Sequence, residues 1–164
     1  MRAPGDQIPA QKAALRTEIL QILRALTAAE RTRRSALICE RLADLEAWRR
    51  AHRILFFTPF PSEPDIQPLF QSAPASGKEV AMIPNTLAPG EALQIPFVPD
   101  LVLVPGLAFS AGGHRLGRGN GVYDRLLAGE LWDAATVGIC FRLQLRDHIP
   151  LEDHDVILDA VVHD

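Results

Sequence analysis

The chain has 164 residues, 48% of them hydrophobic and 23% charged, which excludes a disordered chain and fits one globular domain over residues 1–164. Its net charge of −3 lacks the basic excess of a nucleic-acid-binding protein. No apolar run approaches the roughly 20 residues of a membrane span, and residues 1–10 lack the apolar core of a signal peptide, so we expect a cytoplasmic protein without a nucleic-acid or membrane partner.

The chain begins with two predicted helices. From Gln11 onward, apolar residues recur at helical spacing as far as Leu26. Thr27, with Glu30 three positions later, forms a capping box that starts a second helix. We expect this second helix to end near Trp48.

The rest of the chain alternates between predicted strands and helices. In order, these are a strand at 53–58, a helix that opens at Asp65 and fades by Gly77, strands at 80–83 and 101–104, a helix at 122–128, and strands at 136–141 and 156–162. The proline-rich stretch 84–100 is interpreted as a connecting loop that can include a short edge strand at 93–98. This alternation, without hairpin signals, predicts a Rossmann-like α/β fold of three layers, with a mainly parallel sheet and helices on both faces.

A loop rich in glycine and arginine follows the strand at 101–104. Five of the eleven glycines fall between Gly112 and Gly121, and Arg115, Arg118 and Arg125 are interleaved with them or follow them. No Gly-Lys-Ser/Thr follows, as a Walker A loop requires, and the dinucleotide fingerprint Gly-x-Gly-x-x-Gly does not occur. A glycine loop between a strand and a helix, at the edge where parallel sheets bind ligands, predicts a phosphate-binding site.

Other charged residues have two interpretations each. Lys12 and Arg16 lie one turn apart on one helix face, which for an isolated pair is more typical of a solvated basic surface. Asp124 and Asp155 are suited to Mg²⁺ beside a phosphate loop, or to a helix N-terminus and a turn. Their spacing alone does not choose between these alternatives.

Glu63 follows the first strand and so lies at the same sheet edge. Asp65 is more simply explained as a helix N-cap, whereas Glu63 has no capping role and is the better candidate for a ligand contact. Cys39 and Cys140 lack a Cys-x-x-Cys spacing and are expected to be buried thiols. The histidines are scattered, and no Ser-His-Asp or Cys-His motif supports nucleophilic hydrolysis.

Two segments, Leu103–Phe109 and Gly113–Arg125, closely resemble the signature of the 5-formyltetrahydrofolate cyclo-ligase family, also called 5,10-methenyltetrahydrofolate synthetase. Further matches are Lys12 and Arg16 to the family's Lys-x-x-x-Arg, Glu63-Pro64-Asp65 to its acidic segment, and Gln144, Pro150 and His154-Asp155 to its C-terminal pattern. The resemblance covers nearly the whole chain in order.

The resemblance implies an α/β ligase of one-carbon metabolism that uses ATP and Mg²⁺. In such an enzyme the formyl oxygen of 5-formyltetrahydrofolate attacks the γ-phosphate of ATP. The neighbouring N10 then closes on the activated carbon, and loss of phosphate leaves 5,10-methenyltetrahydrofolate beside ADP. The implied partners are a reduced folate and ATP, and the expected state is a monomer or weak homodimer.

The resemblance also assigns roles to residues. The implied catalytic residues are Arg115, Arg118 and Tyr123. The implied ATP-binding residues are Lys12, Arg16, Arg115, Leu116, Gly117, Arg118, Gly119, Asn120, Gly121, Val122 and Tyr123. The implied substrate-binding residues are Arg16, Glu63, Arg118, Gly119, Asn120 and Gly121. Asp124 and Asp155 are the implied Mg²⁺ ligands.

The chain departs from the family pattern mainly on the folate side. The stretch 85–99 is shorter than its family counterpart, which helps to form the folate pocket. Ile66 replaces the family's threonine, and Val122 replaces the first tyrosine of Tyr-Tyr-Asp. The alternatives are therefore a paralogue that acts on another small substrate and a non-catalytic protein that binds nucleotide or folate.

Overall fold

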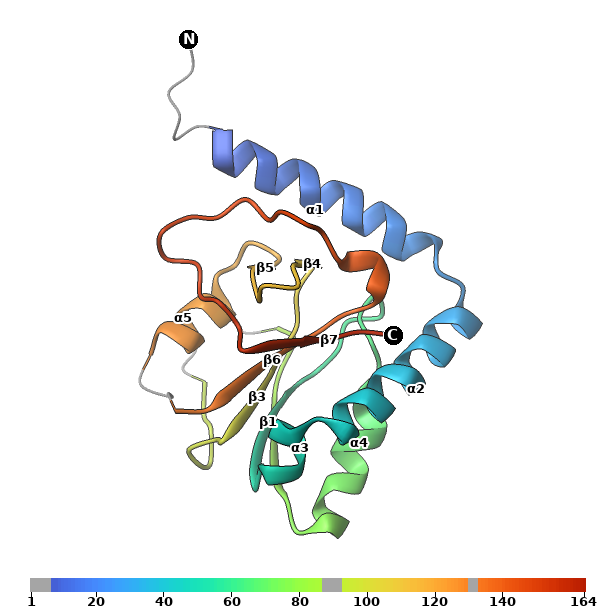
Figure 1. Cartoon of the computed structure of the whole chain (residues 1–164), viewed down its shortest axis with the longest axis vertical. Coiled ribbons are helices and arrows are strands. Elements are labelled where there is room, and N and C mark those ends of the chain that lie inside the picture. The colour runs from blue at the N-terminus through green and yellow to red at the C-terminus, as the bar shows by residue number, and fades with distance from the viewer. Residues whose placement is uncertain (1–6, 87–92, 130–132) are drawn as a thin grey trace.

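A five-stranded parallel sheet forms the centre of the protein (Figure 1). The computed structural model describes residues 7–86, 93–129 and 133–164. The strands are β1 (Arg53–Phe57), β2 (Glu79–Ile83), β3 (Leu101–Val104), β6 (Ala135–Ile139) and β7 (Ala160–Val162). They pair in the order β2-β1-β3-β6-β7, and every pairing is parallel. This is the strand order of a doubly wound α/β sheet, so the predicted fold class is confirmed.

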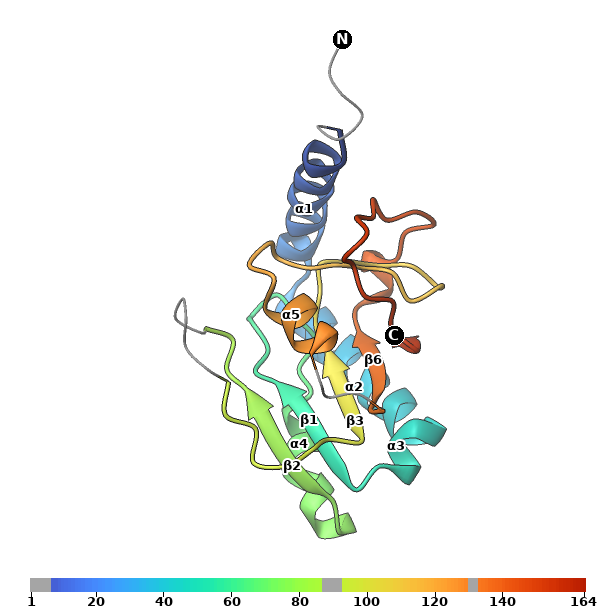
Figure 2. The same cartoon turned by 90° about the vertical axis from the view of Figure 1, so that its left-hand side faces the viewer.

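The direction of chain winding reverses between β1 and β3. From β1 the chain crosses to β2 on one side, and it then returns to β3 on the other side. In such sheets ligands bind outside the carboxyl ends of the strands at this point. In Figure 2 the strands point toward the end of the molecule where α1 (Gln7–Ala25) lies, together with the glycine-rich segment.

Helices cover both faces of the sheet. One face packs against α2 (Ala28–Asp44), α3 (Glu46–Arg50) and α4 (Gln67–Ser72), and the other against α5 (Val122–Ala128). The alternation along the strands explains the division. In β1, Ile54 and Phe56 belong to the larger core cluster and Leu55 to the smaller one, because successive strand residues point to opposite faces. The described residues also form two short 3₁₀ helices, Ala73–Ser76 and Arg142–Gln144.

The second helix starts where the sequence predicts and ends earlier. The Thr27 hydroxyl accepts the Glu30 N–H at 3.2 Å, and the Glu30 carboxylate accepts the Thr27 N–H at 3.0 Å, so the capping box is confirmed. Leu45 is extended and separates α2 from α3. The break directs Trp48 into the core, where its ring packs edge-on against the Phe56 ring with 6.0 Å between the ring centres.

A hairpin that the sequence analysis missed lies inside the glycine-rich segment. The strands β4 (Ala108–Phe109) and β5 (Arg115–Leu116) pair in antiparallel fashion, so the expectation of no hairpin was wrong. Gly113 closes its turn with φ of +86°, and a Cβ there would lie 2.1 Å from the Leu158 carbonyl oxygen. Glycine is therefore required at this position.

Two predicted strands are shorter in the structure than expected, and a third does not form. The closing strand begins at Ala160 rather than at 156, because the Leu158 N–H donates to the Gly113 carbonyl of the hairpin turn instead of to the sheet. The described residues 93–98 form no strand, and Pro96 lacks the N–H that a ladder needs. β6 ends at Ile139, two residues before the predicted end.

The elements at the β2 side also differ. The strand predicted at 80–83 is β2, which begins at Glu79 and lies at the edge of the sheet, so that only Ile83 is fully buried. α4 begins at Gln67 with Ile66 in the cap position, although the Asp65 carboxylate still accepts the Gln67 N–H at 3.0 Å. None of the described helices is long and apolar enough to cross a membrane.

Gly138 in β6 is packed against the hairpin. A Cβ at this position would lie 2.6 Å from the Phe109 ring and 3.0 Å from the Leu158 side chain. We expect Gly138→Ala to lower the free energy of unfolding by about 1–3 kcal/mol, because overpacking forces both neighbours to move. Urea unfolding measures the change. In the control Gly112→Ala the nearest atom lies 3.6 Å away, so its stability should stay close to that of the wild type, and equal losses in both variants would contradict the packing argument.

Candidate functional site

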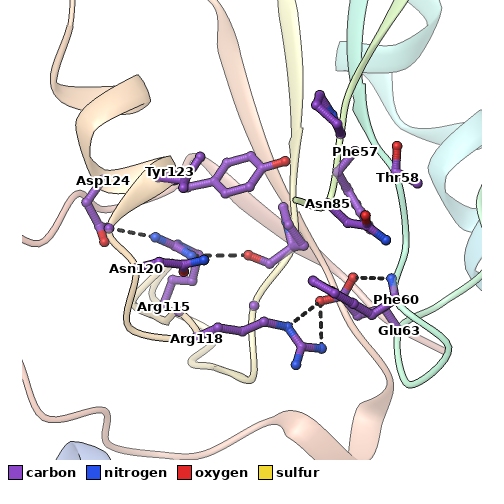
Figure 3. Close-up of a pocket in the computed structure, with 16 residues that line it drawn as sticks. Phe57, Thr58, Phe60, Glu63, Asn85, Arg115, Arg118, Asn120, Tyr123 and Asp124 are labelled. Carbon is purple, nitrogen blue, oxygen red and sulfur yellow. Dashed lines mark hydrogen bonds and ion pairs between the residues drawn. The ribbon is translucent and has the colours of Figure 1, made fainter. Parts of the chain in front are cut away.

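A pocket lies at the carboxyl ends of β1, β2 and β3, where the winding reverses (Figure 3). Its lining residues are Phe57, Thr58, Phe60, Glu63, Pro84, Asn85, Pro105, Gly106, Arg115, Gly117, Arg118, Asn120, Gly121, Val122, Tyr123 and Asp124. The glycine-rich segment thus faces the ends of β1 and β2 across one cavity. Most of the residues that the sequence assigned to ATP and substrate gather here.

Arg115 is anchored on the floor of this pocket. Its side chain is only 5% exposed. The guanidinium donates to the Asp124 carboxylate at 2.7 Å and to the Pro105 carbonyl at 3.2 Å, and it lies 5.8 Å from the centre of the Tyr123 ring. A buried cation with a fixed orientation is suited to a phosphate group.

Arg118 extends across the pocket mouth toward the end of β1. Its Nε and Nη2 donate to Glu63 Oε1 at 3.1 and 3.0 Å, and Nη2 also donates to the Ser62 hydroxyl at 3.1 Å. The guanidinium stacks 4.3 Å from the centre of the Phe60 ring. Figure 3 shows this pair joining the two walls of the pocket.

Glu63 is a buried carboxylate with a structural role that the sequence analysis missed. Its Oε2 accepts the Phe60 N–H at 2.9 Å, which closes the turn after β1. Burial raises the pKa of Glu63, and the Phe60 N–H and Arg118 oppose that change without cancelling it. Burial also raises the pKa of the Tyr123 phenol, with a further contribution from Glu63, so Tyr123 stays protonated and can donate a hydrogen bond.

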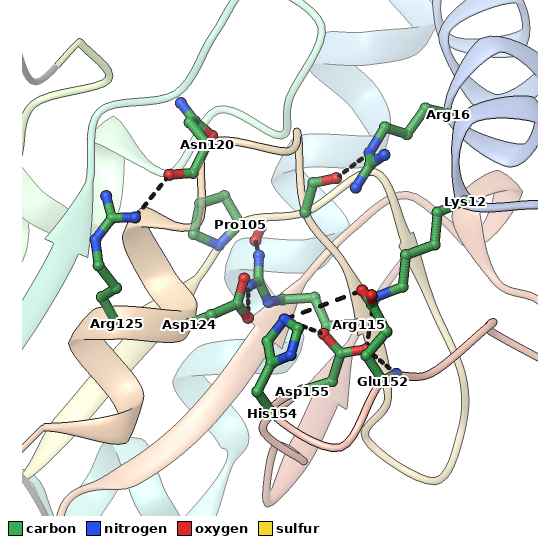
Figure 4. A network of polar contacts seen from close by, with 11 residues as sticks. Lys12, Arg16, Pro105, Arg115, Asn120, Asp124, Arg125, Glu152, His154 and Asp155 are labelled. Atoms are coloured by element: carbon green, nitrogen blue, oxygen red, sulfur yellow. Dashed lines mark hydrogen bonds and ion pairs between the residues drawn. The ribbon is translucent and has the colours of Figure 1, made fainter. Parts of the chain in front are cut away.

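Lys12 lies in a second polar cluster beside the pocket (Figure 4). It comes from α1, yet its ammonium contacts Glu152 at 2.6 Å and Asp155 at 2.7 Å, more than 130 residues away. Burial lowers the pKa of Lys12, but the hydrogen bonds to Asp155 and Glu152 together outweigh it and raise the pKa. Lys12 is buried, with 6% of its surface exposed, so the interpretation of the Lys12 and Arg16 pair as a solvated basic surface is wrong for Lys12.

Arg16 holds the glycine loop in place. Its Nε donates to the Gly117 carbonyl at 2.9 Å. Gly119 and Gly121 follow with φ of +104° and +64°, a region that favours glycine. The loop then enters α5, and Arg125 donates back to the Asn120 carbonyl at 3.1 Å. Helix α1 thus fixes the backbone of the segment that lines the pocket.

The two aspartates assigned to a metal ion occupy different polar groups. Asp124 pairs with Arg115, whereas the ligand atoms of Asp155 lie within 4.8 Å of those of Glu152 and His154. The pKa of Asp155 is lowered, since the bonds from Lys12 and from the Glu152 N–H outweigh its burial. Both carboxylates are oxygen donors of the kind that Mg²⁺ prefers.

Two other residues that the resemblance named, Gln144 and Leu116, are buried and support the fold around the pocket. Gln144 is fully buried and donates to the Gly106 and Leu107 carbonyls at 2.9 and 3.0 Å, which fixes the backbone just after β3. The Leu116 side chain is 1% exposed and packs in the core rather than lining the pocket. Any contact of Leu116 with a nucleotide would therefore use its backbone.

The thiols have no part in the described site. Cys140 is buried as expected, whereas Cys39 is only half-buried, which corrects the expectation of two buried thiols. Burial raises the pKa of Cys39 to about 11 and raises that of Cys140 as well. Neither thiol is a reactive thiolate near neutral pH.

Comparisons with known proteins agree with one another. The model of the 5-formyltetrahydrofolate cyclo-ligase family matches residues 8–96 and 88–164. The mouse 5-formyltetrahydrofolate cyclo-ligase is 29% identical over 190 residues, and the alignment covers 93% of each chain. The enzyme of the same name from Escherichia coli K12 is 27% identical over 173 residues, covering 88% of this chain and 95% of that one.

Two solved structures are similar in fold. The 5,10-methenyltetrahydrofolate synthetase of Aquifex aeolicus has a TM-score of 0.77 and 26% identity, with 93% of this chain and 89% of that chain covered. The 5,10-methenyltetrahydrofolate synthetase of Mycoplasma pneumoniae has a TM-score of 0.78 and 25% identity, with 92% and 97% covered.

Proposed function

Because the chain belongs to the 5-formyltetrahydrofolate cyclo-ligase family, it is a ligase that uses ATP, and we propose that it closes 5-formyltetrahydrofolate to 5,10-methenyltetrahydrofolate in the pocket at the ends of β1 and β3. The observation that supports this site most directly is the pairing of Arg118 with Glu63 across the pocket. It places a cation of the glycine loop beside a buried carboxylate of the opposite wall. The arginine could bind the phosphates of ATP, and the carboxylate could accept hydrogen bonds from the reduced folate.

The proposed reaction conserves all atoms in three steps. The formyl oxygen forms a bond to the γ-phosphorus while the bond to the bridging oxygen breaks, so ADP leaves. N10 of the folate then attacks the activated formyl carbon and loses its proton. Cleavage of the bond between that carbon and the phosphate oxygen releases phosphate and leaves the methenyl bridge. Such a phosphoryl transfer needs positioning and neutralisation of charge more than a protein nucleophile.

The residues of the pocket fit these needs. Arg115 is held by the Pro105 carbonyl and Asp124, so it can meet charge that develops on the transferred phosphate without reorganising. Arg16 extends from α1 to the Gly117 carbonyl of this segment, and Lys12 extends from the same helix to Asp155 beside it. Both would add positive charge for the remaining phosphates. Glu63 would accept N–H bonds from the pterin, and the protonated Tyr123 would donate one in the pocket.

Mg²⁺ is proposed to join this site through Asp124 and Asp155. When bound, Mg²⁺ neutralises phosphate charge and orients the phosphate oxygens. The carboxylate ligands fit that ion. Asp124 pairs with Arg115 through Oδ1 and Asp155 pairs with Lys12 through Oδ2, so the other oxygen of each carboxylate could bind Mg²⁺. The single domain over 1–164, the monomeric or weakly dimeric state and the cytoplasmic location stay predictions.

The folate side depends on the shortened stretch 85–99. Its first residue, Asn85, lines the pocket beside Pro84, and residues 87–92 lie outside the described ranges. The proposal therefore needs a direct assay of the folate reaction.

Turnover tests the proposed function. Purified protein mixed with 5-formyltetrahydrofolate, Mg²⁺ and ATP should produce the absorbance of the methenyl product together with one ADP per turnover. A reaction without ATP is the matched control. If ATP binds but no methenyl product forms, the proposal fails, and a paralogue with another substrate or a non-catalytic binding protein replaces it.

A further inference from the structure

Arg118 pairs with a group on the folate side while it belongs to the segment assigned to the nucleotide. It lies between Gly117 and Gly119 in the loop, yet its contacts are with Ser62, Glu63 and the Phe60 ring after β1. One arginine therefore joins the two walls of the pocket.

This contact uses the acceptor capacity of Glu63. Oε1 receives two N–H groups of Arg118, and Oε2 receives the Phe60 N–H. The Glu63 side chain is 4% exposed, so water cannot readily replace a lost donor. A pterin that is to donate its amino and N3 hydrogens to Oε1 must displace Arg118, and Arg118 in turn needs another anion.

The loop allows such an exchange. Arg16 holds the Gly117 carbonyl at 2.9 Å, which fixes the backbone before Arg118. Gly119 follows with φ of +104°, and glycine gives this position the widest conformational freedom. The Arg118 side chain is 26% exposed, compared with 5% for Arg115. Arg118 is thus the less buried of the two pocket arginines, so its side chain can change partners with less repacking.

We infer that Arg118 couples the two substrates: the phosphates of ATP draw it away from Glu63, the freed carboxylate then binds the pterin, and each ligand strengthens binding of the other. The inference rests on the proposed function and adds to it a thermodynamic link between the two sites. ATP alone would leave a buried acceptor without a donor, and folate alone would leave Arg118 without an anion. Only the ternary complex satisfies both groups, which is the condition for positive coupling.

Calorimetry measures this link. The dissociation constant of 5-formyltetrahydrofolate is determined without nucleotide and with saturating Mg²⁺ and the β,γ-imido analogue of ATP, which does not transfer its phosphate. We expect the analogue to tighten folate binding by roughly tenfold or more, within the usual range of coupling between sites. In Arg118→Ala the two dissociation constants should agree within about twofold. Arg118→Lys should restore part of the ratio, because an ammonium can also exchange between carboxylate and phosphate.

Arg125→Ala is the matched control. It removes a second arginine of the same segment, whose contact is with the Asn120 carbonyl rather than with Glu63, so the ratio should stay as in the wild type. Folate binding that is unaffected by the analogue in the wild type overturns the inference, and so does an unchanged ratio in Arg118→Ala. Either result leaves the turnover assay, and with it the proposed function, intact. Absence of folate binding under both conditions overturns the inference and the proposed function together, and turnover then fails as well.

Discussion

Replacing Arg115 with alanine should lower kcat/KM for ATP by on the order of 100-fold or more, since loss of one well-placed donor in a preorganised site has effects of this size. The variant also leaves Asp124 without the cation that it contacts at 2.7 Å. The Arg115 stem packs closely against Gly106, since a Cβ at that glycine would lie 3.0 Å from the Arg115 Cγ atom. Some loss of packing therefore accompanies the loss of charge. Steady-state kinetics with varied ATP measures the effect.

Arg115→Lys separates the two contributions. Lysine keeps the charge and most of the stem but cannot donate to Asp124 and the Pro105 carbonyl with the same planar geometry. We expect its stability to be close to that of the wild type while most of the loss in kcat/KM remains. Kinetics of Arg115→Ala equal to those of the wild type would show that this arginine does not contact the phosphates.

Replacing Lys12 with methionine should raise the KM for ATP and lower kcat/KM, again by on the order of 100-fold. Methionine keeps the length of the stem, so the packing of α1 changes little. The substitution removes the ammonium between Glu152 and Asp155 and leaves two carboxylates side by side. Their repulsion adds an unfavourable charge near the phosphates.

Glu152→Gln is the control for Lys12. It removes the negative charge of one partner of the ammonium, whose side chain is 37% exposed, and keeps the ion pair with Asp155. We expect less than a tenfold change in kcat/KM. Equal losses in Lys12→Met and Glu152→Gln would indicate that the ion-pair cluster, rather than contact between Lys12 and the nucleotide, is responsible.

The local signals of the sequence predicted the regular elements well. The capping box of Thr27 and Glu30 marked the start of α2, and the apolar run Leu101–Val104 coincides with β3. The hairpin β4–β5 was missed because strands of two residues are too short to show an alternating pattern. The break at Leu45 was missed because no glycine or proline marks it.

The sequence indicated the residue types of the candidate site, and the structure added contacts that the sequence did not indicate. Glycine and arginine in the segment 105–125 indicated a phosphate loop from chemistry alone. The contacts of Lys12 with Glu152 and of Arg118 with Glu63 join residues 140 and 55 positions apart. Such pairs depend on how α1 and the turn after β1 pack onto the folded sheet, and the spacing of residues in the sequence does not predict that packing.

The peripheral position of β2 has an evolutionary consequence. Among the described strands, β2 pairs with β1 alone, and the chain that follows it leaves the sheet at Pro84 and Asn85, which line the pocket. Insertions and deletions after this strand leave the ladder between β1, β3 and β6 unbroken. Selection can therefore lengthen or shorten the rim proposed to meet the folate, while the segment proposed to bind phosphate, anchored between β3 and α5, is inherited unchanged. A lineage can in this way alter what it accepts without rebuilding how it handles phosphate.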